Sequence, residues 1–243
     1  DNVKTGDIVT FTGSADTGKM LKAHPRLIEE AVPFNMEADS LNCSVLGEDA
    51  VQGTAEFDIF IKEVQKEMTV KAGQKCTAVR RIIVPEKTLD DVNKALCERL
   101  SQTIIGDPSV KEVKMGSLAG HPQVVEVSEK VNKLSESQKI IFGDLKNFEV
   151  VGADKNKGAF ISPILFLNDK PFEKTDCHNI EAFGPVSTIL PYKDLNEAIE
   201  LSRMGKGSLV CSIVTSDDKI AREFTVNAAS MHGRILVLNK DCA

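Results

Sequence analysis

Three apolar runs near the end of the chain constrain its fold more than any other feature. Residues 186–190, 209–214 and 235–238 are apolar and rich in β-branched side chains, without strict alternation of polar positions. Runs of this kind are typical of strands that are covered on both faces. Helical patterns at 195–203 and 217–227 separate them. The order strand–helix–strand–helix–strand therefore predicts a parallel α/β layer.

Similar patterns continue towards the start of the chain. Within residues 55–71, apolar side chains recur at steps of three and four, which is typical of a helix with one buried face. We expect an α/β protein with a mostly parallel sheet covered by helices on both faces. The remaining predicted strands are 8–11, 32–37, 43–46, 77–84, 139–142 and 158–167, and the remaining predicted helices are 15–23, 89–104 and 123–134.

Composition narrows the class of protein. The 243 residues are 42% hydrophobic and 27% charged, which is ordinary for a globular chain and suggests one large domain, or one domain with part of another. The net charge of −6 is spread over mixed Lys and Glu stretches, which gives nucleic-acid binding little support. No apolar run reaches the ~20 residues of a membrane span, and the polar start of the chain does not look like a signal peptide.

The cysteines favour free thiols in a reducing cytoplasm, because they are scattered and form no CxxC pair. Cys43, Cys97 and Cys211 fall within apolar segments, and we expect them in the core. Adjacent Cys177 and His178 are a weak metal candidate, since neighbours in sequence rarely reach one ion and no second pair accompanies them. We therefore predict no metal centre.

One thiol differs from the others. Cys76 lies in Ala-Gly-Gln-Lys-Cys-Thr-Ala, between a predicted helix and a predicted strand. Gly73 removes bulk beside it and Lys75 can favour its ionised form, so a substrate could reach a nucleophilic thiolate. The alternative is a buried, space-filling cysteine, which is the commoner role.

Glu37 is a candidate general base. It lies in the weakly polar stretch Phe-Asn-Met-Glu-Ala-Asp, where its pKa could rise far enough for proton transfer. The alternative is a solvated carboxylate at the end of a strand. A thiol enzyme whose covalent intermediate is hydrolysed needs both a nucleophile and such a base.

Two glycine-containing turns flank these residues in the sequence. Phe-Thr-Gly-Ser at 11–14 joins a predicted strand to a predicted helix, with Ser14 as N-cap. The unpaired N–H groups of such a helix start can hold a phosphate. Glu-Ala-Phe-Gly-Pro at 181–185 reads as a turn before a strand. Either segment could be a turn with no ligand.

A hydrolase that pairs a cysteine with a histidine is an open alternative, because catalytic triads assemble in space rather than in sequence. No histidine lies in a recognisable active-site segment, and we expect each to be a surface or capping residue. The four candidates are His24, His121, His178 and His232.

Taken in order, F-T-G-S at 11–14, the glutamate segment at 36–40, G-Q-x-C at 73–76 and E-x-F-G-P at 181–185 resemble the NAD(P)-dependent aldehyde dehydrogenase superfamily. The glutamate segment departs from the family's usual Glu-Leu-Gly-Gly-Lys, so only the glutamate carries over. The resemblance implies Cys76 as nucleophile, Glu37 as base, Gly13 beside the nicotinamide, Ser14 at the pyrophosphate, Glu181 at the nicotinamide-side ribose and Phe183 against the nicotinamide ring.

The resemblance also implies a domain division. Residues 1–37 would be the C-terminal remnant of a Rossmann-like cofactor domain, and residues 38–243 would be the catalytic domain. Family members are about twice as long and carry an upstream Asn of the oxyanion hole, and this chain does not begin with Met. We therefore expect part of a longer enzyme, folded but inactive alone, because a missing oxyanion donor costs roughly 3–4 kcal/mol of barrier.

Within the superfamily, residues 36–42 and 231–242 are most similar to the semialdehyde dehydrogenase half of bifunctional phenylacetate-degradation proteins, which join it to an oxepin-CoA hydrolase. This resemblance implies a CoA-linked (semi)aldehyde substrate, NADP or NAD as cofactor, a cytoplasmic location and a homo-oligomer. A CoA-acylating relative is the alternative, although such enzymes tend to lack the glutamate found here at position 37.

Overall fold

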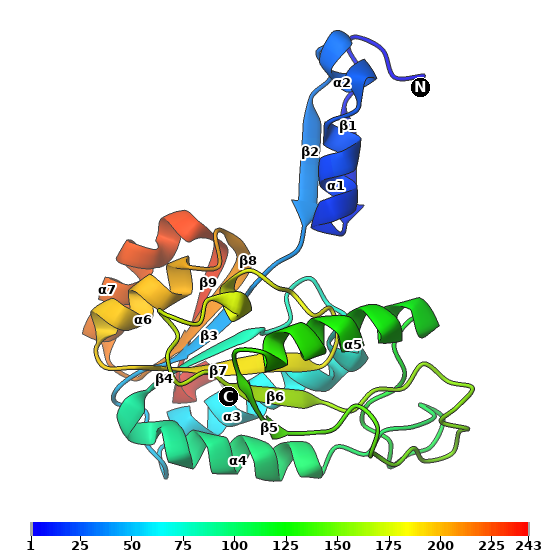
Figure 1. The fold of residues 1–243 in the computed structure, drawn as a ribbon. Helices are drawn as coiled ribbons and strands as arrows, with labels where there is room; N and C mark the ends of the chain where they lie inside the picture. Colours follow the sequence, from blue (N-terminus) through cyan, green and yellow to red (C-terminus); the bar gives the residue numbers. More distant parts are fainter. Residues whose placement is uncertain (1, 243) are drawn as a thin grey trace. The chain divides into compact units, whose positions relative to one another are not determined.

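The computed structural model describes residues 2–242, which fall into two compact units within Asp1–Ser40 and Leu41–Ala243. We call these the N-terminal unit and the large unit, and describe each by itself. Figure 1 shows both, with the N-terminal unit in blue and the large unit from light blue to red. Among the described residues, no helix is both long and apolar enough to cross a membrane.

The N-terminal unit is one strand–helix–strand motif. Strand β1 (Val9–Gly13) pairs in parallel with β2 (Phe34–Ala38), and this register sets Thr12 opposite Glu37. The connection contains α1 (Ala15–Lys22) and the short helix α2 (Pro25–Glu29). The sequence analysis missed α2, although Pro25 at its first turn is a typical helix-start signal.

The large unit is built on a seven-stranded sheet with the order β5-β6-β7-β4-β3-β8-β9. Neighbouring strands are parallel, except that β5 runs antiparallel to β6. This arrangement confirms the predicted α/β fold with a mostly parallel sheet. The strands are β3 (Cys43–Leu46), β4 (Arg81–Pro85), β5 (Lys139–Phe142), β6 (Ile164–Leu167), β7 (Val186–Tyr192), β8 (Ser208–Val214) and β9 (His232–Leu238).

Helices cover both faces of this sheet, as Figure 1 shows. One apolar core contains side chains of α3 and α4, and the other contains side chains of α5, α6 and α7. Strand β4 contributes side chains to both cores, because Ile82 and Val84 lie in the first core and Ile83 lies in the second. The helices are α3 (Ala55–Thr69), α4 (Leu89–Ser101), α5 (His121–Ser135), α6 (Leu195–Arg203) and α7 (Asp218–Ala228).

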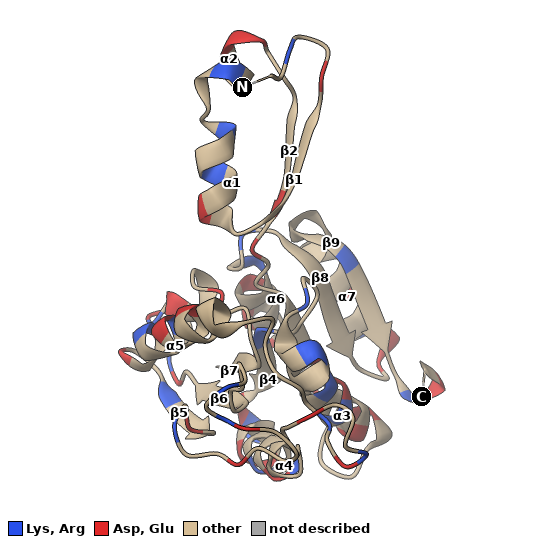
Figure 2. Cartoon of the chain, turned by 90° about the vertical axis from the view of Figure 1, so that its right-hand side faces the viewer, with Lys and Arg blue, Asp and Glu red and all other residues tan. Residues whose placement is uncertain are grey.

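Five single turns of 3-10 helix complete the large unit: Val70–Gly73, Glu86–Thr88, Asp176–His178, Ala229–Met231 and Lys240–Cys242. Figure 2 shows Lys and Arg interspersed with Asp and Glu along the helices of this unit. Apart from buried Glu56, the charged residues of these helices are exposed or half-buried, whereas the apolar side chains of the two cores are buried.

Two predicted strands are shorter in the structure than in the sequence analysis. Residues 158–167 form a strand only from Ile164, because Pro163 has no N–H to donate to a ladder. Residues 77–84 form a strand only from Arg81. The residues before Arg81 do not join the sheet there. They form hydrogen bonds with the Asn42 side chain and, through Arg80, with the segment 181–184, and these contacts form the candidate site.

Candidate active site

Cys76 lies on the segment between α3 and β4, which we call the thiol loop (residues 70–80). Its side chain is exposed, whereas Cys43, Cys177 and Cys211 are buried. The space-filling alternative for Cys76 therefore has no support within the large unit. Cys97 is only half-buried, so the prediction of a core position holds fully for Cys43 and Cys211 alone.

The backbone of the thiol loop is strained just before the thiol. Lys71, Ala72 and Gly73 follow one another in the left-handed region, with φ values of 54°, 51° and 68°. Side chains other than glycine rarely adopt this conformation. Strain of this kind persists where the surrounding structure holds the chain in place, and it is concentrated at functional sites.

Asn42 is one of the residues that hold the loop. Its side chain is fully buried and donates hydrogen bonds to the carbonyls of Cys76 at 2.9 Å and Ala78 at 3.0 Å. The side-chain Oδ1 atom of Asn42 accepts a hydrogen bond from the backbone N–H of Val210 at 3.0 Å. Asn42 thus ties the thiol loop to β8, and the peptide unit that carries the thiol has a fixed position.

Arg80 joins the thiol loop to the segment 181–185, which we call the Glu-Phe loop. Its guanidinium donates to the carbonyl of Gly73 at 2.8 Å, to the carbonyl of Gly184 at 2.6 Å and to Glu181 Oε1 at 3.0 Å. The Arg80 guanidinium carbon also lies 5.5 Å from the ring centre of Phe183. One buried side chain therefore fixes both predicted motifs relative to each other.

The two loops also touch through their backbones. A Cβ on Gly73 would collide with the carbonyl of Gly184 and the nitrogen of Pro185, so this close approach requires a glycine at position 73. The positive φ of Gly73 favours the same residue type. The first glycine of G-Q-x-C is thus explained by packing against E-x-F-G-P.

The Arg80–Glu181 pair is almost completely removed from water, with both side chains only 4% exposed. Burial lowers the pKa of Arg80, and the neighbouring Glu181 carboxylate opposes that effect. Removing one partner of such a pair leaves the other as an isolated buried charge. Little of the Glu181 carboxylate is open to a ligand in this conformation, whereas the ring of Phe183 is exposed.

Lys75 does not act as the sequence analysis expected. Its ammonium group forms an ion pair with Glu67 at 2.7 Å. The positive charge of Lys75 is therefore directed to a carboxylate on α3 rather than reserved for the thiol.

In the N-terminal unit, Gly13 ends β1 and Ser14 caps α1. The Ser14 hydroxyl accepts from the backbone N–H of Thr17 at 3.3 Å, as predicted for an N-cap. The N–H of Ala15 donates to the Asp39 carboxylate at 2.9 Å, so an anionic group already sits at this helix start. Glu37 is exposed and lies at the same end of the strand pair.

The structure thus brings the predicted site residues together in two groups. In the large unit, Arg80 joins the thiol loop, through Gly73, to Glu181 and Phe183. The N-terminal unit unites Gly13, Ser14 and Glu37 at the carboxyl ends of its two strands.

The sequence analysis did not identify Arg80 or Asn42. The signal for Arg80 was its place beside Arg81, because two adjacent charges lead directly into the apolar run of β4. Charged residues in such a position are buried only when they are paired. Asn42 gave a similar signal, since it precedes a strand in which every residue is buried.

The histidines give the Cys/His alternative no support within the large unit. His178 is buried against Arg81 and the carbonyl of Pro171, contrary to the prediction of a surface or capping residue. His121 is exposed and His232 lies beside Ser208. In the N-terminal unit, His24 caps α2 as predicted.

The large unit thus combines a mostly parallel α/β sheet with an exposed thiol on a strained loop. Residues 3–237 match the Aldehyde dehydrogenase family. The chain therefore belongs to the aldehyde dehydrogenase family.

Curated relatives agree with this assignment. The chain is 40% identical over 239 residues to the 3,4-dehydroadipyl-CoA semialdehyde dehydrogenase of Aromatoleum evansii, covering 98% of this chain and 46% of that protein. It is 40% identical over 127 residues to Protein MaoC of Klebsiella aerogenes, a match that covers 52% of this chain and 36% of that protein. The chain thus spans about half or less of the length of these relatives.

Solved structures confirm the fold. Betaine aldehyde dehydrogenase of Staphylococcus aureus, in complex with NAD+, superimposes with a TM-score of 0.84 at 22% identity, over 95% of this chain and 43% of that one. An aldehyde dehydrogenase from Bacillus cereus gives a TM-score of 0.81 at 24% identity, over 95% and 44%.

Proposed function

We propose that this chain carries the catalytic thiol of an NAD(P)-dependent aldehyde dehydrogenase, within a longer enzyme. The observation that carries the proposal is the exposed Cys76 on a strained loop that buried Arg80 joins to the Glu-Phe loop. Residues 1–37 form the end of the cofactor domain and residues 38–243 the catalytic domain in this proposal.

The Cys76 thiolate attacks the aldehyde carbon and forms a thiohemiacetal. The backbone N–H of Cys76 stabilises the developing oxyanion. The Asn42 side chain donates to the carbonyl of Cys76 and so holds the peptide unit after the thiol. Bound NAD(P)+ supplies the hydride acceptor for the oxidation that leaves a thioester on the sulfur. Water then attacks the thioester, Glu37 takes the water's proton, and the acid leaves as the thiolate reforms.

Ser14 and the start of α1 offer an anion site. In this structure the N–H of Ala15 donates to the Asp39 carboxylate, which a bound phosphate would have to displace. A pyrophosphate beside Ser14 would use the same positive end of the helix. Gly13, Glu181 and Phe183 are the further residues that would hold the nicotinamide half. For Glu181, contact with a ribose requires its buried carboxylate to become more open than it is here.

The substrate we propose is a CoA-linked semialdehyde from phenylacetate or related aromatic catabolism. The support is the 40% identity to a 3,4-dehydroadipyl-CoA semialdehyde dehydrogenase over nearly the whole chain. A cytoplasmic location and a homo-oligomer belong to the same proposal and rest on the family alone.

A CoA-acylating enzyme is the second candidate, in which CoA rather than water takes the acyl group. Glu37 favours hydrolysis, because only hydrolysis needs a base for water. Product analysis decides between them: free acid is expected, and a new acyl-CoA thioester formed at the aldehyde carbon would favour the second candidate.

The test of the proposal is a cysteine pair in the longer enzyme. Cys76→Ser should lower kcat by at least about 10⁴-fold, because the hydroxyl is a far weaker nucleophile than a thiolate. Cys242→Ser is the matched control, since Cys242 is the other exposed thiol, and it should keep activity. Full activity of Cys76→Ser would refute the proposed role.

A further inference from the structure

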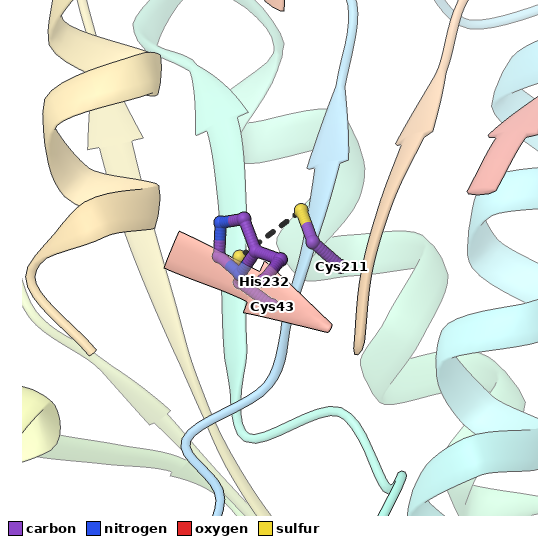
Figure 3. Close-up of side chains that lie close together, drawn as sticks. All are labelled: Cys43, Cys211 and His232. Atoms are coloured by element: carbon purple, nitrogen blue, oxygen red, sulfur yellow. Dashed lines mark hydrogen bonds between the residues drawn. The ribbon is translucent and has the colours of Figure 1, made fainter. Parts of the chain in front are cut away.

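A second group of sulfur and nitrogen atoms lies within the sheet of the large unit (Figure 3). Cys43 on β3 and Cys211 on β8 face each other in register, and their sulfur atoms are 3.4 Å apart. His232 begins β9. One ligand atom from each of these three residues lies within 4.8 Å of the others. Both thiols are buried, whereas His232 is half-buried.

The hydrogen bonds of His232 leave one ring nitrogen available. Ser208 Oγ lies 3.1 Å from the carbonyl of Val210 and 2.6 Å from His232 Nδ1. In the tautomer with the proton on Nδ1, Ser208 accepts that proton and Nε2 keeps its lone pair. It is buried and has no hydrogen-bond partner within the described part of the chain. Buried polar atoms without a partner are uncommon, and an ion is one standard explanation.

A partner on the second ring nitrogen orients a histidine ligand, and the Ser208 hydroxyl at His232 Nδ1 is such a partner.

One buried positive charge lies beside the two thiols. Arg81 pairs in register with Cys43 and is fully buried, and its guanidinium donates to the carbonyls of Leu41, Leu201 and Ser202. No ion pair joins it to a carboxylate of the described residues.

We propose that Cys43, Cys211 and His232 form a binding site for Zn²⁺, with solvent as the fourth ligand. This site lies outside the residues proposed for aldehyde oxidation. Two thiolates and one imidazole are a typical zinc donor set. With Zn–S bonds of about 2.3 Å, tetrahedral thiolates lie about 3.8 Å apart, so the sulfurs need move only a few tenths of an ångström from 3.4 Å.

Binding forms two Zn–S bonds and one Zn–N bond, breaks two S–H bonds and releases two protons to solvent. No electron is transferred. The affinity should therefore rise with pH. The bound ion would link β3, β8 and the edge strand β9, and so act on the structure of the sheet.

The test uses the reduced, chelator-treated chain with Cys76→Ser and Cys242→Ser, because exposed thiols could bind zinc themselves. Titration with Zn²⁺ against a chromogenic chelator should give one ion per chain, and Co²⁺ should give a thiolate-to-metal charge-transfer band. Cys43→Ser, Cys211→Ser and His232→Ala should each lower the affinity by more than about 100-fold. Cys97→Ser is the control and should leave the affinity unchanged.

Ser208→Ala keeps the test decisive if a cysteine variant does not fold. It removes only the hydroxyl bonded to Nδ1 and should weaken binding by about 10–100-fold. The proposal is overturned if the parent chain binds no stoichiometric Zn²⁺, or if binding is unchanged in Ser208→Ala and in the folded ligand variants. Formation of a Cys43–Cys211 disulfide in place of zinc binding would also overturn it.

Discussion

The two groups of candidate site residues are held in place by different means. In the large unit, the thiol loop and the Glu-Phe loop are fixed by buried side chains, Arg80 and Asn42, whose bonds reach several backbone carbonyls. In the N-terminal unit, Gly13 and Glu37 are exposed at the strand ends of a two-stranded motif. Changes in the first group should therefore affect both stability and activity, and changes in the second should affect activity alone.

The largest effect that this comparison predicts in the N-terminal unit comes from Glu37→Gln. Turnover in the longer enzyme should fall by about 10²–10⁴-fold, because no base remains to deprotonate water. The first burst of NAD(P)H should survive, since acylation of Cys76 precedes hydrolysis. Rapid-mixing absorbance measures both phases. Stability should stay unchanged because the carboxylate is exposed.

The control for Glu37→Gln is Glu29→Gln, an exposed carboxylate in the same unit, which should leave burst and turnover as they are. An equal fall of burst and turnover in Glu37→Gln would mean that Glu37 acts before or during acylation, and the hydrolytic role would be wrong.

Arg80→Met should give the largest loss of stability. It takes the Arg80 guanidinium away from the buried Glu181 carboxylate and removes the donors to Gly73 and Gly184. Breaking one side of a buried ion pair costs about 3–5 kcal/mol. Urea unfolding of the chain measures this free energy.

Two further variants separate the buried charge from simple loss of packing. Arg80→Met with Glu181→Gln should recover part of the stability, because the buried side chain at position 181 then carries no charge. Arg26→Met removes the partly exposed pair with Glu30 in the N-terminal unit and should cost no more than about 1 kcal/mol. Similar losses from Arg80→Met and Arg26→Met would contradict the difference between the two units.

Acid should destabilise the large unit through His178. Burial, with the charge of Arg81, lowers the pKa of His178 from 6.5 to about 4. Its Nδ1 accepts from Arg81 at 3.2 Å and its Nε2 donates to Pro171 at 3.0 Å, so the folded state holds the neutral ring. Unfolding takes up a proton between pH 4 and 6.5. Stability is therefore complete above that window and falls by about 3 kcal/mol as the pH drops through it.

Urea unfolding at a series of pH values checks this dependence. His178→Gln should flatten part of the slope, leaving the part due to His232, whose pKa is lowered to about 4 in the same way. His24→Gln is the matched change in the N-terminal unit and should leave the slope in place. A slope that is the same with and without His178 would contradict the prediction.

The sequence predicted the architecture well where local pattern determines structure. The apolar runs at 43–46 and 139–142 and the helix at 195–203 have the predicted bounds, because burial and capping are local signals. The sequence analysis predicted the position of the thiol loop between a helix and a strand, but not its backbone conformation. Its form depends on Arg80, whose partners Glu181 and Gly184 are more than a hundred positions away.

The same reasoning explains the incomplete prediction of the site. Cys76 stood out because small residues surround it, and the structure places it on the surface of the large unit. The burial of Glu181 and the pairing of Lys75 with Glu67 arise from contacts between distant elements. The cluster of Cys43, Cys211 and His232 comes from three different strands, so no spacing in the sequence could indicate it.

The most direct test of the central claim is to trap the acyl group on the longer enzyme. Glu37→Gln enzyme, given an aldehyde and NADP+ and then quenched in acid, should carry a thioester on the peptide that contains Cys76, found by mass spectrometry. Cys242 should stay unmodified. A wild-type rate of NADPH formation with no acyl group on Cys76 would contradict the account.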